Sequence, residues 1–292
     1  MEPCRLCPRE CGVLRSEGET GFCGVGAEAV VARAAPHFWE EPCISGTRGS
    51  GTVFFSGCNL RCVYCQNRTI SSRSFGKTLS AAELRDVFLR LIDVGVHNIN
   101  LVTPTHYAHV IANALERPLG VPVVYNCGGY ESADTLRMLE GKIDVYLTDM
   151  KYSDAALAAR LSGAEDYFPK ACEAVREMSR QVGGYVLDDD GLMLRGLIVR
   201  HLILPGYMEN TRGVLEWYAD SFAGRHVKLS LMGQYFPPED AEKLGAPDRT
   251  LSPEEYVEAM ELCSALGITD GYFQELEAAS TAYVPPFDLT GV

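Results

Sequence analysis

The chain has no run of 18 apolar residues, and its first ten residues, MEPCRLCPRE, contain no apolar signal-peptide core. We therefore expect neither a membrane partner nor secretion, and we expect the protein in the cytoplasm. Basic residues are also scarce, since 26 Lys and Arg stand against 39 Asp and Glu, a net charge of −13 over 292 residues. A sequence-independent duplex-binding protein needs a basic face, so no nucleic-acid partner is expected.

Internal repeats, low-complexity stretches and an obvious interdomain linker are missing as well. Hydrophobic residues make up 47% of the chain and charged residues 22%, which is ordinary for a globular protein. The sequence SGTRGSG at 45–51 is the one plausible boundary. It predicts a Cys-rich metal-binding lobe over residues 1–48 and a second domain over 49–292 that ends in a helix and a tail.

From Thr52 onward, short apolar runs alternate with helical stretches. Strands are predicted at 52–56, 98–103, 122–126, 145–149, 194–204 and 227–231. Helices are predicted from Ser80 to about residue 95, at 108–115, at 132–139 and at 214–222, and one begins at Ser252. A longer helical region is predicted after the strand at 145–149 and runs through Met178. Such alternation indicates an α/β fold with a parallel sheet covered by helices, either a doubly wound sheet or a partial barrel. Ligand sites in these folds gather at the carboxyl ends of the strands.

Eleven cysteines in a cytoplasmic chain indicate metal ligands or redox groups before disulfides. The four near the amino terminus are Cys4, Cys7, Cys11 and Cys23, and a second group is Cys58, Cys62 and Cys65. The other four, Cys43, Cys127, Cys172 and Cys263, are scattered, as buried small apolar residues tend to be.

The spacing C-x3-C-x2-C from Cys58 to Cys65 directly follows the first predicted strand. Three thiolates on one compact loop can hold three corners of a 4Fe–4S cubane. The missing fourth ligand leaves one iron open, which is typical of a reactive site. The alternatives are a zinc site with a borrowed ligand and a cluster of buried thiols. The polar residues Asn59, Arg61 and Gln66 disfavour the second of these.

The amino-terminal spacing C-x2-C-x3-C-x11-C supplies four ligands, enough for a zinc ion or for a second 4Fe–4S cluster. Reduced thiols in a loosely packed lobe are the alternative. His37 and the pair Glu40 and Glu41 follow this segment. A charge pair beside Trp39 is typical of a solvated loop.

The segment GCNLRCVYCQN resembles the signature of the radical S-adenosylmethionine (SAM) superfamily, including the aromatic Tyr64 before the last cysteine. The blocks CRLCPRECGV, HFWEEPCISG, NINLVTPTHY, VVYNCGGYE, DMKY, IVRHLILPG and LMGQY extend this resemblance over nearly the full length. They resemble the branch that is similar to pyruvate formate-lyase-activating enzymes.

The resemblance implies a partial (β/α)6 barrel in which Cys58, Cys62 and Cys65 hold a 4Fe–4S cluster. It further implies that the open iron binds the amino and carboxylate groups of SAM. A reductant such as flavodoxin or ferredoxin would supply the electron that cleaves SAM to methionine and a 5′-deoxyadenosyl radical. That radical would abstract hydrogen from a protein, peptide or small-molecule substrate. The alternatives are a glycyl-radical-enzyme activase and a non-catalytic iron–sulfur electron carrier.

Several residues at strand ends are candidates for SAM binding. Asp149 and Lys151 lie two apart and point to the same side, as in the family's Asp-x-Lys block, although a plain salt bridge is the alternative. Arg200 and His201 alternate faces, and the resemblance favours Arg200 as partner of the methionine carboxylate. His201 is a candidate cofactor contact or a hydrogen-bonded barrel histidine.

The remaining candidates follow other strands. Thr103 stands where many relatives carry Gly-Gly-Glu, so threonine hydroxyls or free backbone carbonyls would replace that motif. Asn126 and Gln234 occupy rim positions suited to ribose or substrate contacts, or serve as turn-stabilising amides. Tyr64 is a candidate adenine contact, with packing beside the loop as the alternative.

Overall fold

Parallel strands form the centre of the computed structural model, which describes residues 3–222, 224–274, 276 and 284–292. The sheet has the strand order β10-β9-β8-β6-β5-β4-β2-β1-β3, and β7 pairs with β8. The strands are β1 (Ala29–His37), β2 (Ser50–Phe55), β3 (Lys77–Leu79), β4 (Ile99–Val102), β5 (Val123–Cys127), β6 (Val145–Asp149), β7 (Val186–Leu187), β8 (Met193–Leu202), β9 (Lys228–Met232) and β10 (Gly271–Phe273).

The helices connect these strands and cover the sheet. They are α1 (Pro42–Ser45), α2 (Arg68–Ser71), α3 (Ala81–Asp93), α4 (Ala108–Ala114), α5 (Ala133–Met138), α6 (Ala155–Ser162), α7 (Tyr167–Val182), α8 (Met208–Phe222), α9 (Ala241–Leu244) and α10 (Pro253–Ala265). Two short 3₁₀ helices, η1 (Arg15–Glu17) and η2 (Thr105–Tyr107), complete the described elements. None of the described helices has the length and apolar character needed to cross a bilayer.

The predicted parallel sheet is confirmed. Strands β2, β4, β5, β6, β8 and β9 pair in parallel, and β10 adds to β9 in the same direction. Every residue of β2, β4 and β5 is buried, which is the pattern of strands covered on both faces. The sheet stays open because β3 and β10 are its edges, so the architecture is the predicted partial barrel.

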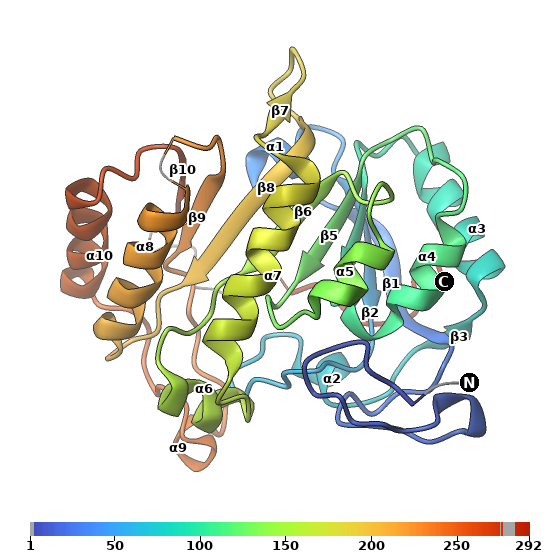
Figure 1. Ribbon diagram of the computed structural model, residues 1–292, viewed down its shortest axis with the longest axis horizontal. Helices are drawn as coiled ribbons and strands as arrows, with labels where there is room; N and C mark the ends of the chain where they lie inside the picture. The colour runs from blue at the N-terminus through green and yellow to red at the C-terminus, as the bar shows by residue number, and fades with distance from the viewer. Residues whose placement is uncertain (1–2, 223, 275, 277–283) are drawn as a thin grey trace.

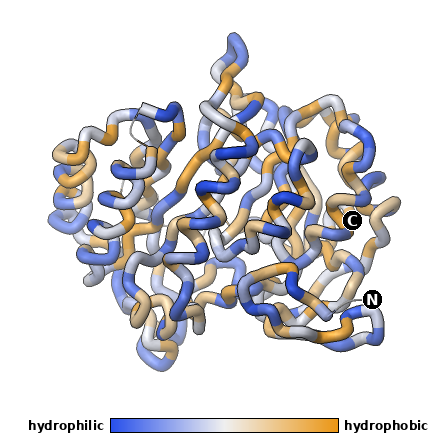
Figure 2. Tube along the Cα trace, in the orientation of Figure 1, coloured by the Kyte–Doolittle hydropathy of each residue, from blue (hydrophilic) through white to orange (hydrophobic). Residues whose placement is uncertain are grey.

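Helices α3, α4, α5, α7 and α8 cover one face of the sheet, while α1 lies behind it (Figure 1). The covering helices bury one stripe, as α3 does with Leu84, Val87, Phe88 and Leu91. Figure 2 shows the same division, with hydrophobic colour along central strands and hydrophilic stretches on the outer turns of helices. The α/β layers therefore place the main core between the sheet and these helices.

The short helix α1 packs into the concave face of the sheet. Cys43 and Ile44 form a separate apolar cluster with Val124, Leu147 and Ile198 from β5, β6 and β8. Figure 1 shows α1 near the end of the sheet where β7 lies, and α2 near the opposite end. The helix therefore closes the amino-terminal end of the barrel lumen, while the carboxyl ends of the strands face the other way.

The predicted helix starts are confirmed at two capping boxes, Ser80 with Glu83 and Ser252 with Glu255. The predicted helical region through 178 is two helices, because Gly163 adopts a left-handed φ of 57° and ends α6. The predicted helix at 214–222 begins six residues earlier, at Met208.

Strand β1 was not predicted from the sequence. It pairs antiparallel with both β2 and β3, so residues 29–37 belong to the main sheet. The division of the chain at residue 48 stays a prediction, and it falls between two hydrogen-bonded strands of one sheet.

Gly129 offers a stability test of the turn after β5. Its φ is 80°, and an added Cβ would lie 2.1 Å from the carbonyl oxygen of Asp149. We expect Gly129→Ala to lower the free energy of unfolding by about 3 kcal/mol, because it adds a backbone clash to left-handed strain. Urea unfolding measures the loss.

The matched control is Gly120→Ala. Gly120 has a similar φ of 83°, but nothing lies within 4 Å of its added Cβ. This variant should lose only about 1 kcal/mol from backbone strain. Equal losses in the two variants would contradict the close approach at Gly129.

Candidate metal and cofactor site

The cysteine loop begins at a glycine that no other residue can replace without a clash. Gly57 has a φ of 81°, and an added Cβ would lie 2.7 Å from the carbonyl oxygen of Cys23. The preceding carbonyl, of Ser56, accepts hydrogen bonds from His106 Nε2 at 2.9 Å and from the Tyr107 hydroxyl at 3.1 Å. The chain therefore turns sharply after β2 and lies against the amino-terminal segment.

Cys58, Cys62 and Cys65 are brought together on this loop, and all of the chain's cysteines are free thiols. The Cys58 sulfur accepts from the Leu60 amide at 3.3 Å, and the Cys62 sulfur accepts from the Ser162 hydroxyl at 3.0 Å. Burial, aided by the neighbouring Cys62 thiol, raises the pKa of Cys58 to about 12. The pKa of Cys65 is raised by the same two causes.

This donor set fits an iron–sulfur cluster, because three free thiols share one short loop and sense one another's charge. In the part of the chain that the structure describes, no group of three or more His, Cys, Asp or Glu side chains is arranged to hold a single metal ion. A 4Fe–4S cubane holds its ligands farther apart than a single metal ion does. The absence of such a group therefore applies to single-ion sites and does not test a cluster at Cys58, Cys62 and Cys65.

Arg9 ties the amino-terminal segment to the cysteine loop. Its Nε donates to the Asn59 carbonyl at 2.9 Å, and its Nη2 donates to the Ser162 carbonyl at 2.8 Å. Its guanidinium lies over the Phe22 ring, 3.9 Å from the centroid. Asn59 is held further by its own amide, which donates to the Tyr130 carbonyl at 2.6 Å.

The four amino-terminal cysteines also gather in one place. The thiols of Cys4 and Cys11 are hydrogen-bonded, and Cys7 senses the charges of Cys4 and Cys23. Burial is the main cause that raises the pKa of Cys7 to about 12. The metal at these residues, zinc or a second cluster, stays a prediction.

Asp149, Lys151 and Arg200 form a buried charge cluster at the ends of β6 and β8. Asp149 accepts from Lys151 Nζ through Oδ2 and from Arg200 Nε at 2.8 Å through Oδ1. Arg200 also donates to Asn126 Oδ1 at 2.6 Å and pairs with Glu40 Oε2 at 3.3 Å. Burial opposes the ionisation of Asp149, but the charges of Arg200 and Lys151 outweigh it and lower its pKa.

One cavity of about 300 Å³ joins this charge cluster to the cysteine loop. Its walls come from the loop, from the carboxyl ends of β5, β6, β8 and β9, and from the segment before α1. The predicted residues that line it are Cys62, Tyr64, Cys65, Asn126, Asp149, Lys151, Arg200 and Gln234. The structure therefore brings most of the predicted site to one place.

Glu40 and Glu41 do not lie on a solvated loop, and that expectation was wrong. The Glu40 side chain is 10% exposed and Glu41 is 8% exposed, and both line the cavity. The reason is that α1 packs inside the barrel and carries the preceding residues with it. The apolar pair Cys43 and Ile44, which follows after Pro42, was the one local signal of burial.

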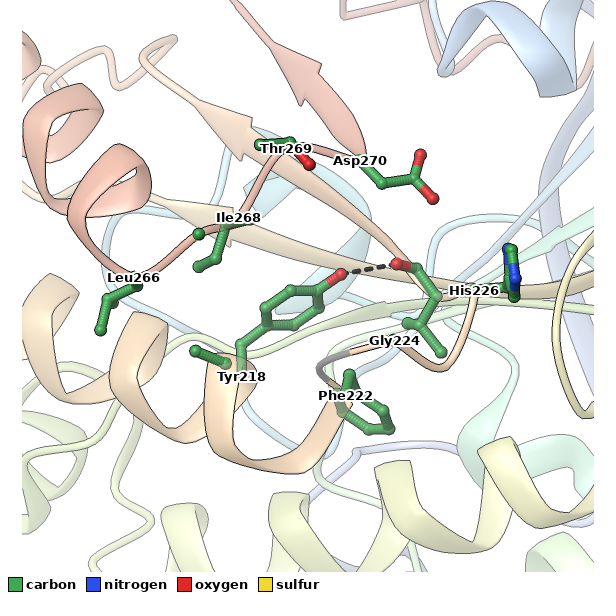
Figure 3. Close-up of a pocket in the computed structure, with 11 residues that line it drawn as sticks. Tyr218, Phe222, Gly224, His226, Leu266, Ile268, Thr269 and Asp270 are labelled. Carbon is green, nitrogen blue, oxygen red and sulfur yellow. Dashed lines mark hydrogen bonds between the residues drawn. The ribbon is translucent and has the colours of Figure 1, made fainter.

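A second hollow of about 260 Å³ lies at the amino ends of β9 and β10 (Figure 3). The Tyr218 hydroxyl reaches across it and donates to the Val227 carbonyl at 2.6 Å. No cysteine lines this hollow. It lies at the end of the sheet opposite to that where α/β ligand sites form.

The comparisons with known proteins agree with this geometry. Residues 52–187 match the sequence model of the radical SAM superfamily. Over these residues the chain is similar to radical SAM domains. Uncharacterized protein MJ0674 of Methanocaldococcus jannaschii is 29% identical over 270 residues, which cover 89% of this chain and 73% of that protein. Uncharacterized protein MJ0808 of the same organism is 25% identical over 238 residues, or 73% of this chain and 63% of that protein.

Solved structures show the same fold. Streptococcus suis SuiB bound to S-adenosylmethionine superposes with a TM-score of 0.50 at 13% identity, covering 76% of this chain. SuiB bound to its precursor peptide SuiA gives a TM-score of 0.51 at 12% identity. The chain spans about half the length of SuiB, 49% and 48% in the two comparisons.

Three residues predicted for the cluster and SAM site, Cys58, Thr103 and His201, do not line the cavity. His201 faces away from it, and both ring nitrogens are engaged, Nδ1 with the Met150 carbonyl at 2.7 Å and Nε2 with the Thr211 hydroxyl at 3.0 Å. Thr103 adopts a φ of 61° and does not line the cavity. Tyr64 lines it, but its hydroxyl is bonded to that of Tyr152 at 2.8 Å.

Glu131 is a buried carboxyl group that the sequence did not single out. It follows β5 and accepts from the Thr105 hydroxyl at 2.7 Å and the Tyr125 hydroxyl at 3.0 Å. Burial raises its pKa from 4.5 to about 7, although these hydrogen bonds act in the other direction. It thereby ties η2, the segment after β4, to the turn after β5.

Glu131 predicts a pH dependence of stability. Between pH 4.5 and about 7, the Glu131 carboxyl group is protonated more often in the folded state than in the unfolded state. The free energy of unfolding should therefore fall across that window by an amount on the order of 3 kcal/mol through this group. Glu131→Gln should remove that part of the slope in urea unfolding from roughly pH 4 to pH 8.

The control is Glu116→Gln, which changes an exposed carboxylate. It should keep the pH slope of the unchanged protein. The assignment to Glu131 would be contradicted if Glu131→Gln and Glu116→Gln showed the same slope.

Proposed function

We propose that the protein is a radical SAM enzyme in which Cys58, Cys62 and Cys65 hold a 4Fe–4S cluster. The observation that supports this most is the single cavity shared by the cysteine loop and the charge cluster of Asp149, Lys151 and Arg200. When bound, the cluster supplies the electron that cleaves the S–C bond of SAM, and the resulting 5′-deoxyadenosyl radical takes hydrogen from the substrate. The reductant proposed is a flavodoxin or ferredoxin.

Arg200 and Lys151 are proposed to bind the polar groups of SAM. A guanidinium has five N–H donors, and Arg200 uses three of its nitrogens on Asp149, Glu40 and Asn126. Each Nη therefore keeps one N–H for a carboxylate. Lys151 has three donors and shares one with Asp149, while Asp149 fixes both cations in place.

The surroundings of Cys62 are proposed to position the cysteine loop and keep water away from it. The Ser162 hydroxyl donates to the Cys62 sulfur, and Tyr152 links Ser162 to Tyr64 through bonds of 2.7 and 2.8 Å. Tyr64 itself is only 7% exposed. Hydrogen bonds to ligand sulfurs and burial are two means by which a protein tunes a cluster.

The substrate is proposed to be a small molecule, or one side chain of a peptide or protein. The cavity of about 300 Å³ is at the lower end of the range for small-molecule sites, and SAM is proposed to share it, so only a small group of the substrate fits beside SAM. The activase and electron-carrier alternatives stay predictions, because no described residue specifically favours either.

The first test is the production of 5′-deoxyadenosine. After anaerobic reconstitution with iron and sulfide and reduction by dithionite, the protein should release 5′-deoxyadenosine from SAM slowly without substrate. The triple variant Cys58→Ala, Cys62→Ala, Cys65→Ala should fall to the protein-free background, because the cluster has lost its ligands. Chromatography of the quenched reaction measures the product.

Cys172→Ala is the matched control, since Cys172 is a buried thiol on α7 that does not line the cavity. This variant should keep the rate of the unchanged protein. Absence of 5′-deoxyadenosine from the unchanged protein, with a cluster signal that does not respond to SAM, would favour the electron carrier.

The second test concerns Cys4, Cys7, Cys11 and Cys23, which we propose hold a metal of their own. In the triple variant of the other site, metal should remain bound, because these four thiols supply a complete ligand set. Elemental analysis then identifies it. About four irons per chain indicate a second cluster, zinc indicates a structural site, and neither metal would contradict the proposal.

A further inference from the structure

Glu41 has a carboxylate oxygen that no described group satisfies. The residue lies at the start of α1, where its backbone carbonyl accepts from the amides of Ile44 at 2.8 Å and Ser45 at 3.0 Å. Its side chain makes no capping bond to the helix. Glu41 is 8% exposed, and among the described residues Oε2 has no hydrogen-bond partner. The side chain is therefore buried for a reason other than closing the helix.

The neighbouring Glu40 shows the contrast. Its Oε1 accepts from Asn100 at 2.9 Å and from Asn126 at 3.2 Å, and its Oε2 pairs with Arg200 at 3.3 Å. Both carboxylate oxygens of Glu40 are thus used within the protein. Only Glu41 of this pair keeps an oxygen available for another molecule among the described residues.

The cavity lining has one carboxylate more than cations, and Glu41 is the carboxylate without a direct ion pair, although the charge of Arg200 acts on Glu41 as well as on Glu40. The described lining contains three carboxylates, Glu40, Glu41 and Asp149, against the two cations Lys151 and Arg200. The direct contacts pair those cations with Asp149 and Glu40. Burying an unpaired carboxylate is costly, so a site of this kind favours a positively charged ligand.

A second unsatisfied acceptor lines the same cavity. Gln274 follows β10, and its Oε1 is buried without a hydrogen-bond partner among the described residues. Ser230 of β9 is paired with Arg200 of β8, and its side chain is hydrogen-bonded to that of Glu41. Two unsatisfied acceptors in the lining of one cavity favour a ligand rich in N–H donors.

The Glu41 side chain lies beside the charge cluster. Helix α1 packs on Val124, Leu147 and Ile198, which precede Asn126, Asp149 and Arg200 along their strands. The Glu41 side chain nevertheless reaches Ser230, which is paired in register with Arg200, as Arg200 is with Asp149. A ligand at Glu41 therefore lies at the level of Arg200 in the sheet.

We propose that Glu41 recognises the substrate, and that its free oxygen accepts N–H bonds from the ammonium or guanidinium group of a small organic cation. The inference rests on the proposed function only in calling this cation the substrate. The remaining N–H groups of Arg200 are assigned to SAM, and the free oxygen of Glu41 is assigned to the cation.

The test uses the reconstituted protein and two pairs of probes. Equilibrium dialysis under anaerobic conditions compares n-butylammonium and n-butylguanidinium with the neutral n-butanol and the anionic butyrate. We expect one or both cations to bind and the other two probes not to bind. Glu41→Gln should weaken cation binding about 10- to 100-fold, the size of one charge-assisted hydrogen bond.

Two further variants keep the result interpretable. Glu173→Gln, an exposed change on α7, should bind the cations like the unchanged protein. Glu41→Asp keeps the charge and should retain more cation binding than Glu41→Gln. The thermal midpoint of ligand-free Glu41→Gln should stay equal or rise, because an unpaired buried carboxylate is removed. A lower midpoint would assign Glu41 a structural role and overturn the proposal.

The SAM affinity separates this inference from the proposed function. Glu41→Gln should leave the SAM dissociation constant within about twofold. Weaker SAM binding with unchanged cation binding would overturn the inference, and so would butyrate binding as tightly as n-butylammonium. Cation binding that depends on Glu41 in a protein that forms no 5′-deoxyadenosine would support the inference while the proposed function fails.

Discussion

The buried guanidinium of Arg200 is the contact on which the arrangement of the lumen depends. It joins Asp149 of β6, Asn126 of β5 and Glu40 of the segment before α1. Taking these charges out of water is expensive, and only complete pairing compensates for the cost. The pairing therefore fixes the short helix α1 inside the sheet and, with it, the side chain of Glu41.

The amino-terminal segment and the cysteine loop form a second connected unit. Gly57 and Arg9 bring the loop into direct contact with the lobe that carries the other four cysteines. Arg9 also reaches the carbonyl of Ser162, whose hydroxyl donates to Cys62. The two cysteine groups are thus parts of one packed region.

Local patterns were enough to predict much of the fold and part of the candidate site. The periodicity of apolar residues and the capping boxes identified most barrel strands and helices, and the cysteine spacing picked out the loop that carries Cys58, Cys62 and Cys65. Alternation along β8 correctly separated the faces of Arg200 and His201. Strand β1 was missed because its identity comes from pairing with β2 and β3, which a local pattern does not contain. The burial of Glu40 was missed because its partner Arg200 is 160 residues away.

That separation has a consequence for synthesis of the chain. Helix α1 and the preceding Glu40 are translated before β2, the first parallel strand. Arg200, whose guanidinium pairs with Glu40, is translated only with β8. Because a long-range contact needs both partners, the ion pair between Glu40 and Arg200 cannot form until β8 has been synthesised. About two thirds of the chain therefore precedes the residue that completes this contact of the lumen.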